Sequence, residues 1–185
     1  MSINSDYVSK GFAILMKILV PYVEQELKNT YKENWWYSGV YSKLFPDQQA
    51  YFPMTGSDEE LRQKFDITLV LRTIDLNWGE VFRVQLPRSC RSWVIELINT
   101  RNEWAHQSVD GLKEQDVVRA LDTMALVCGQ INNEAEIELQ GIIRKVRYGS
   151  SRGSIAAPAK KLVAVRKAKP SRASGNVLTQ APASG

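Results

Sequence analysis

Hydrophobic residues recur at intervals of three and four along most of the first 148 residues of this 185-residue chain, the spacing of one face of an α-helix. The segment from about 6 to 31 shows this most clearly, because a single stripe collects Val8, Phe12, Leu15, Leu19 and Leu27. Similar segments run from 57 to 76, from 87 to 107, and after residue 111 as one or two helices. The pattern predicts an all-α domain over residues 1–148, a bundle of four or five helices.

Local signals indicate where these helices begin. The letters SDEE form a capping box in which Ser57 caps a helix and Glu60 bonds back to it, so we expect one helix from here past Leu69. Residues 66–71 (DITLVL) would also suit a β-strand, but no second strand-like run is present to pair with them. Pro87 fits the first turn of the next helix.

The segment 35–56 is rich in aromatic residues and punctuated by Pro and Gly, which predicts a packed loop with a short helix. Its adjacent tryptophans, Trp35 and Trp36, could stack on nucleic-acid bases together with Tyr37 and Tyr41. Such a cluster more often belongs to a core or to a dimer interface, and we favour that interpretation.

Charge divides the chain into an acidic body and a basic tail. Ten of its 24 lysines and arginines lie at or after Arg144, and no acidic residue follows Glu138. The preceding part therefore holds 14 basic residues against 20 acidic ones, a net charge of −6 beside a tail of +10. Residues 149–185 also lose hydrophobic periodicity, so we predict a disordered tail. Such a tail meets nucleic acid, a membrane or an acidic partner, or it is a solvated linker.

Other features favour a soluble, cytoplasmic protein. The most apolar early run, GFAILMKILVPYV, is interrupted by Lys17 and Pro21 and is too short to span a bilayer. Cys90 and Cys128 lie in apolar helical stretches without metal-ligand spacing, so we interpret them as core residues. We expect no metal, no cofactor and no contact with a membrane.

The only histidine lies in the sequence RNEWAH at 101–106. An Arg at this distance before a lone His arises often by chance, so the surroundings decide its meaning. Arg101 falls on the apolar stripe of its helix, four residues after Leu97 and three before Trp104. A guanidinium on a buried face needs a partner. We consider two: an internal salt bridge, or an anion bound in a groove.

The spacing also restricts how these side chains meet. Asn102 and His106 are four residues apart, about 40° around the helix, and are therefore neighbours. Arg101 and His106 are five apart, about 140° around the helix, and do not converge on one ideal helix. Either the helix ends near His106, or a second copy of the same helix completes the site across a two-fold axis.

These residues resemble the Arg-polar-x(3–5)-His signature of the HEPN superfamily. The stretch 71–106 resembles one branch of it, named after a eukaryotic mRNA-surveillance endoribonuclease and found also in bacterial proteins; the matching features are Asp75, Trp78, Phe82, Val94, Leu97, Ile98 and RNEWAH itself. The resemblance implies an all-α HEPN-like fold, a homodimer paired across the motif helices, and metal-independent RNA cleavage.

By this resemblance, His106 would be the general base or acid, Arg101 would hold the scissile phosphate, and Asn102 would orient the imidazole or bind the phosphate. Cleavage would leave a 2′,3′-cyclic phosphate. Because the body is acidic, we expect basic residues near the C-terminus to supply affinity for RNA; these are Arg144, Lys145, Arg147, Lys160, Lys161, Arg166, Lys167 and Lys169.

Two functions follow. The first is an endoribonuclease that acts at a homodimer cleft in a toxin-like, defence or RNA-processing context. The second is a non-catalytic HEPN module that dimerises or docks RNA or protein in a larger assembly. A regulatory partner such as an antitoxin is compatible with both.

Overall fold

The computed structural model of the chain describes residues 3–106 and 113–152. These residues form helices and turns, with no β-strand among them. Five helices have ten or more residues, as expected for a bundle of four or five: α1 (Ile3–Tyr31), α5 (Ile67–Leu76), α6 (Arg88–His106), α7 (Glu114–Gly129) and α8 (Asn133–Arg152). The shorter elements are η1 (Lys32–Asn34), α2 (Trp35–Gly39), η2 (Tyr41–Lys43), α3 (Pro46–Gln49), α4 (Asp58–Arg62) and η3 (Phe82–Val84).

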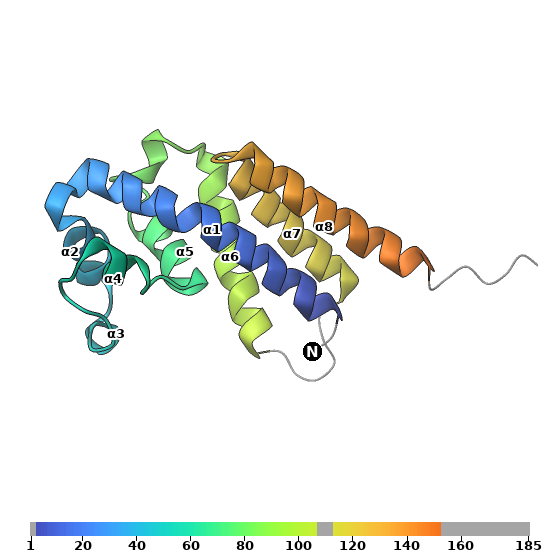
Figure 1. Ribbon diagram of the computed structural model, residues 1–185, viewed down its shortest axis with the longest axis horizontal. Helices are drawn as coiled ribbons and strands as arrows, with labels where there is room; N and C mark the ends of the chain where they lie inside the picture. Colours follow the sequence, from blue (N-terminus) through green and yellow to red (C-terminus); the bar gives the residue numbers. More distant parts are fainter. Residues whose placement is uncertain (1–2, 107–112, 153–185) are drawn as a thin grey trace, which may run out of the picture. The chain divides into compact units, whose positions relative to one another are not determined.

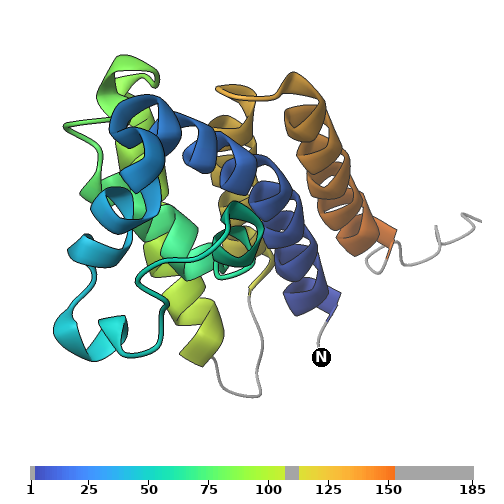
Figure 2. The same ribbon diagram turned by 60° about the vertical axis from the view of Figure 1, so that its left-hand side comes forward.

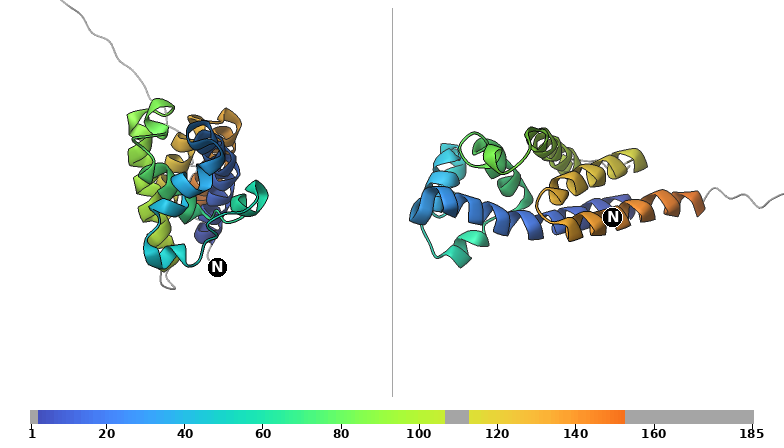
Figure 3. Two further views of the ribbon diagram at one scale, coloured as in Figure 1. Left: turned by 90° about the vertical axis from the view of Figure 1, so that its left-hand side faces the viewer. Right: turned by 90° about the horizontal axis from the view of Figure 1, so that it is seen from above.

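Helix α1 is the element around which the others pack. Figures 1 and 2 show α7 and α8 as an antiparallel hairpin beside its N-terminal half, while α2 and α5 pack against its other half. Helix α6 packs against both α5 and α7 and lies between them in the right-hand view of Figure 3. The prediction of an all-α bundle is therefore confirmed.

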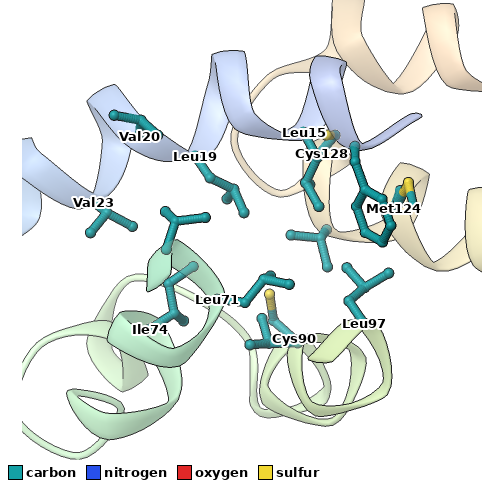
Figure 4. Close-up of a cluster of buried hydrophobic side chains, with 14 of the residues drawn as sticks. Leu15, Leu19, Val20, Val23, Leu71, Ile74, Cys90, Leu97, Met124 and Cys128 are labelled. Atoms are coloured by element: carbon teal, nitrogen blue, oxygen red, sulfur yellow. The ribbon is translucent and has the colours of Figure 1, made fainter. Parts of the chain in front are cut away.

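The core is made by the apolar stripes of these helices. Figure 4 shows Leu15 of α1, Leu71 of α5, Leu97 of α6 and Met124 of α7 pointing toward one another, and all four are fully buried. The two cysteines, Cys90 and Cys128, belong to the same cluster as free, fully buried thiols. Burial raises the pKa of Cys90 to about 11 and, with a smaller contribution from Glu136, that of Cys128 to about 12. They are core residues, as the sequence indicated.

The segment 57–76 departs from the expectation of one helix. The capping box is present, because the Ser57 hydroxyl accepts from the Glu60 N–H and the Glu60 carboxylate accepts from the Ser57 N–H. The helix it starts, α4, ends at Arg62, and a second helix, α5, begins after Asp66. The cause is a second cap: Asp66 is extended, and its carboxylate accepts from the Leu69 N–H at 2.7 Å. The strand alternative for 66–71 is wrong.

Helix α8 continues to Arg152, past the boundary expected at residue 148. Contacts along the chain separate Met1–Ser154 from Ile155–Gly185, and all the helices belong to the first of these units. Among the described residues, no helix is both long enough and apolar enough to cross a membrane. Residues 149–152, predicted as the start of a disordered tail, are helical, and the rest of that predicted tail, 153–185, lies outside the described residues.

Candidate active site on helix α6

All of RNEWAH lies in the last turns of α6, which spans nearly the segment that the sequence predicted. Pro87 precedes the helix, and its carbonyl accepts from the Cys90 N–H at 2.8 Å, so the proline stands where its missing N–H costs nothing. From there α6 buries Cys90, Val94 and Leu97 at helical spacing and presents its other faces outward. The motif thus lies on a helix whose apolar stripe is anchored in the core.

Arg101 continues this buried stripe, and its side chain is half-buried. Its Nε is buried and has no hydrogen-bond partner; Thr68 Oγ1 is the one other such side-chain atom among the described residues. No ion pair joins Arg101 to a described acidic residue. Within that part of the chain, the interpretation of Arg101 as half of an internal salt bridge therefore finds no support. The guanidinium keeps a buried donor for which the described residues supply no acceptor.

Asn102 and His106 lie on another face of the same helix. Asn102 is half-buried, and His106 is the last residue of α6, with its side chain outside the described part. Because α6 is helical from Arg101 through His106, Arg101 and His106 keep their separation of about 140° around the helix axis. One copy of α6 does not bring them together on one face. Glu103, a candidate to orient His106, is exposed.

The face of α6 that carries Asn102 and His106 is exposed in its earlier turns. One and two turns earlier it carries Asn99 and Ile95, both exposed, and the exposed fraction of the apolar Ile95 is 42%. The spacing of 95, 99, 102 and 106 alternates between four and three, which is the spacing of a helix seam.

A contact that the sequence did not reveal holds the end of α6 in place. The Trp104 indole N–H donates to Ser5 Oγ at 3.3 Å. The Trp104 ring also lies against Phe12, with ring centroids 5.8 Å apart and planes tilted by 59°. Both partners belong to the first turns of α1, so the motif turn is bound to the start of the chain's longest helix.

Beside the motif, between α6 and α7, lies a hollow of about 320 Å³. It is lined by Glu96, Asn99, Thr100, Glu103, Asp116, Arg119 and Ala120. Its single cation, Arg119, already pairs with Glu96, with 2.6 Å between Nε and Oε1. Three carboxylates against one arginine make this hollow unfavourable for a phosphate backbone. Among the described residues, no group of three or more His, Cys, Asp or Glu is arranged to hold a metal ion.

The residues assigned to RNA binding divide into two sets. On α8, Arg144 and Lys145 are exposed, while Arg147 pairs with Asp122 of α7, with 3.2 Å between Nη2 and Oδ2. The others lie outside the described residues: Lys160, Lys161, Arg166, Lys167 and Lys169.

The tryptophan pair does not offer a stacking surface. Trp35 and Trp36 are buried, and their indole N–H groups donate to Asp58 at 2.9 Å and to the Pro53 carbonyl at 2.7 Å. Base stacking on these two rings is therefore ruled out, and the core interpretation is confirmed. Tyr37 and Tyr41 stack on each other instead, with ring centroids 5.8 Å apart.

Comparison with known proteins identifies the family. The sequence profile described as Swt1-like HEPN matches residues 10–132, about two thirds of the chain, from α1 through α7 and including the whole motif. Searches of curated proteins and of solved structures found no significant match. The helical fold, the motif at the end of α6 and the extent of this match together place the chain in the Swt1-like HEPN family.

Proposed function

We propose that the protein is a metal-independent endoribonuclease that acts at a homodimer cleft. HEPN domains are a nuclease-type fold, and this chain carries Arg101, Asn102 and His106 complete. The observation that carries the proposal is the buried Nε of Arg101, a donor at the head of the motif to which the described residues offer no acceptor. Such a group costs stability unless something binds it, and a phosphate oxygen is the acceptor that a guanidinium suits best.

The chemistry needs only groups that the RNA and the motif provide. The ribose 2′-oxygen attacks the adjacent phosphorus as it loses its proton, and the bond from phosphorus to the 5′-oxygen breaks as that oxygen gains a proton. His106 takes or gives one of these protons, because the ordinary pKa of histidine lies near neutrality. Arg101 holds the non-bridging oxygens as charge develops on them. The products are a 2′,3′-cyclic phosphate and a 5′-hydroxyl.

In this proposal a second copy of the chain brings together the arginine and the histidine that one copy of α6 keeps apart. Arg101 and His106 of one copy face different directions, whereas two α6 helices paired across a two-fold axis bring the arginine of one copy toward the histidine of the other. The exposed Ile95 and Asn99, which share a face of α6 with Asn102 and His106, support this pairing. Sedimentation analysis should find a dimer, and Ile95→Glu should weaken it.

The direct test is cleavage of end-labelled RNA in EDTA. We expect His106→Ala to lower the rate by about 10²- to 10⁴-fold, the usual contribution of a general acid or base, and Arg101→Ala to abolish cleavage. Arg91→Ala is the matched control, since it removes an exposed arginine from the other end of α6 and one ion pair to Asp75. The control should cleave like the wild type, and the product ends should resist a phosphatase.

Two results would contradict the proposal. Equal cleavage by the wild type and both motif variants would identify a contaminating nuclease. No cleavage by a folded, dimeric protein would favour the second function, a HEPN module that docks RNA or protein without cutting it.

A further inference from the structure

Trp104 stands inside the motif and contacts another helix, α1, through a hydrogen bond to Ser5 and a ring contact to Phe12. It follows Arg101 by three residues, so the two side chains leave the same side of α6 one turn apart. Its ring is half-buried and packs against the core, and its partner Phe12 is almost fully buried. The contact therefore joins Trp104 to the buried core.

Arg101 consequently lies between two anchored neighbours. On one side Leu97 is fully buried in the core, and on the other Trp104 is held by a ring contact to Phe12 and a hydrogen bond to Ser5. The described residues offer the Arg101 Nε no hydrogen-bond partner. The part of α6 that carries Arg101 is therefore held on both sides by packing contacts.

We infer that Trp104 is a positioning residue: by binding the last turn of α6 to the first turns of α1, it holds Arg101 where a phosphate will lie. Trp104 touches no reacting atom and acts through Arg101. The inference rests on the proposed function for its effect on RNA cleavage, but not for its effect on the Arg101 side chain itself. It makes Ser5 and Phe12, about a hundred residues before the motif, part of the active site.

The test combines steady-state kinetics with a direct measurement on Arg101. Trp104→Ala removes both contacts, Trp104→Phe keeps the ring beside Phe12, and Phe12→Leu removes the ring contact from the side of α1. Small misplacements of a catalytic group lower rates by up to about 10²-fold. We therefore expect Trp104→Ala and Phe12→Leu to lower kcat by about 10- to 100-fold with KM little changed, and Trp104→Phe to restore most of the rate.

Trp36→Phe is the matched control. Trp36 also donates one indole hydrogen bond, to Pro53, and also packs against a phenylalanine, with its ring centroid 5.7 Å from that of Phe65. It belongs to α2, away from the motif. This variant should lose stability and keep kcat, which separates general destabilisation from the loss of positioning.

The measurement independent of activity is the ¹H–¹⁵N signal of the Arg101 Nε–H. A buried Nε–H exchanges slowly with water. We therefore expect slow exchange in the wild type, in Trp36→Phe and in Trp104→Phe. We expect fast exchange in Trp104→Ala and in Phe12→Leu. An unchanged signal or an unchanged kcat in these last two variants would overturn the inference. If the wild type does not cleave RNA but the signal responds as expected, the positioning role stands and the proposed function fails.

Discussion

Arg101 carries a buried donor that opposes stability. Its Nε has no hydrogen-bond partner among the described residues, and an unsatisfied buried donor costs about 1–3 kcal/mol. A methionine of similar length would fill the same space without that donor. We predict that Arg101→Met raises the free energy of unfolding by about 1 kcal/mol while abolishing RNA cleavage, as measured by urea denaturation and the cleavage assay.

Arg91→Met serves as the control for this prediction. Arg91 belongs to the same helix but is exposed and paired with Asp75. Its replacement should not stabilise the protein, because no buried donor is removed. A loss of stability in Arg101→Met would mean that the guanidinium already has a partner in the folded protein, and the argument for an anion site would lose its basis.

The sequence predicted part of this arrangement. The spacing from Leu97 to Arg101 to Trp104 was sufficient to place Arg101 on the buried face of a helix. It could not show whether an acidic residue meets the guanidinium, because such a partner comes from another helix. The bond from Trp104 to Ser5 spans 99 positions and leaves no local pattern. Side-chain pairs between distant elements are therefore what sequence reasoning missed.

At the scale of elements, one buried carboxylate holds α4 to α1. Glu24 of α1 is buried and accepts two hydrogen bonds from Arg62 of α4, at 2.5 and 2.9 Å, and one from Lys28 at 2.7 Å. The bonds from Arg62 lower the pKa of Glu24 below its ordinary 4.5, against the opposing effect of burial. The folded protein thus holds this carboxylate charged to a lower pH than the unfolded chain does.

We predict that Glu24→Gln lowers the free energy of unfolding at pH 7 by about 1–3 kcal/mol, the contribution of charged hydrogen bonds. A lowered pKa in the folded state means that the stabilisation is complete above the ordinary pKa and is lost as the pH falls through the lowered value. The difference between wild type and variant should therefore shrink below about pH 4.5. Urea denaturation over this pH range measures it.

Glu59→Gln tests whether the burial of Glu24 is the cause of the stability loss predicted for Glu24→Gln. Glu59 accepts from the same guanidinium, at 2.9 Å from Nη1, but its side chain is 66% exposed. Water screens an exposed pair, so this variant should change stability little and should not alter its pH dependence. Equal effects of the two substitutions would mean that the Glu24 bonds contribute no more than a surface pair.

The boundaries of the helices could be predicted from the sequence where a capping residue was identified as one. Ser57 and Glu60 marked the start of α4 from the sequence alone. The prediction of one continuous helix places Asp66 in its interior, although Asp favours N-cap positions over helix interiors. The hydrophobic spacing of Leu61, Phe65 and Leu69 runs through the break and conceals it, because α4, the turn after it and α5 bury these residues in one core.

Across the whole molecule, the charge of the helical part does not by itself favour binding to RNA. Affinity for RNA depends largely on neutralising phosphates, yet the part of the chain before Arg144 has a net charge of −6, and the hollow beside the motif has three carboxylates against one arginine. On α8, Arg147 is already paired with Asp122. We propose that the basic residues beyond Ser154 supply most of the affinity for RNA.

Truncation after Ser154 keeps α8 intact and removes six of the 24 basic residues: Lys160, Lys161, Arg166, Lys167, Lys169 and Arg172. Each phosphate neutralised on a single strand contributes about 0.7 to the slope of log K against log salt. We therefore expect the truncated protein to bind RNA more weakly, with a slope reduced by up to about 4. A full-length variant with these six residues changed to Gln should behave in the same way, since charge and not length is responsible. Unchanged binding in both proteins, measured by fluorescence anisotropy at several salt concentrations, would instead assign RNA affinity to the helical unit, where Arg101, Arg144 and Lys145 would have to supply it against the surrounding negative charge.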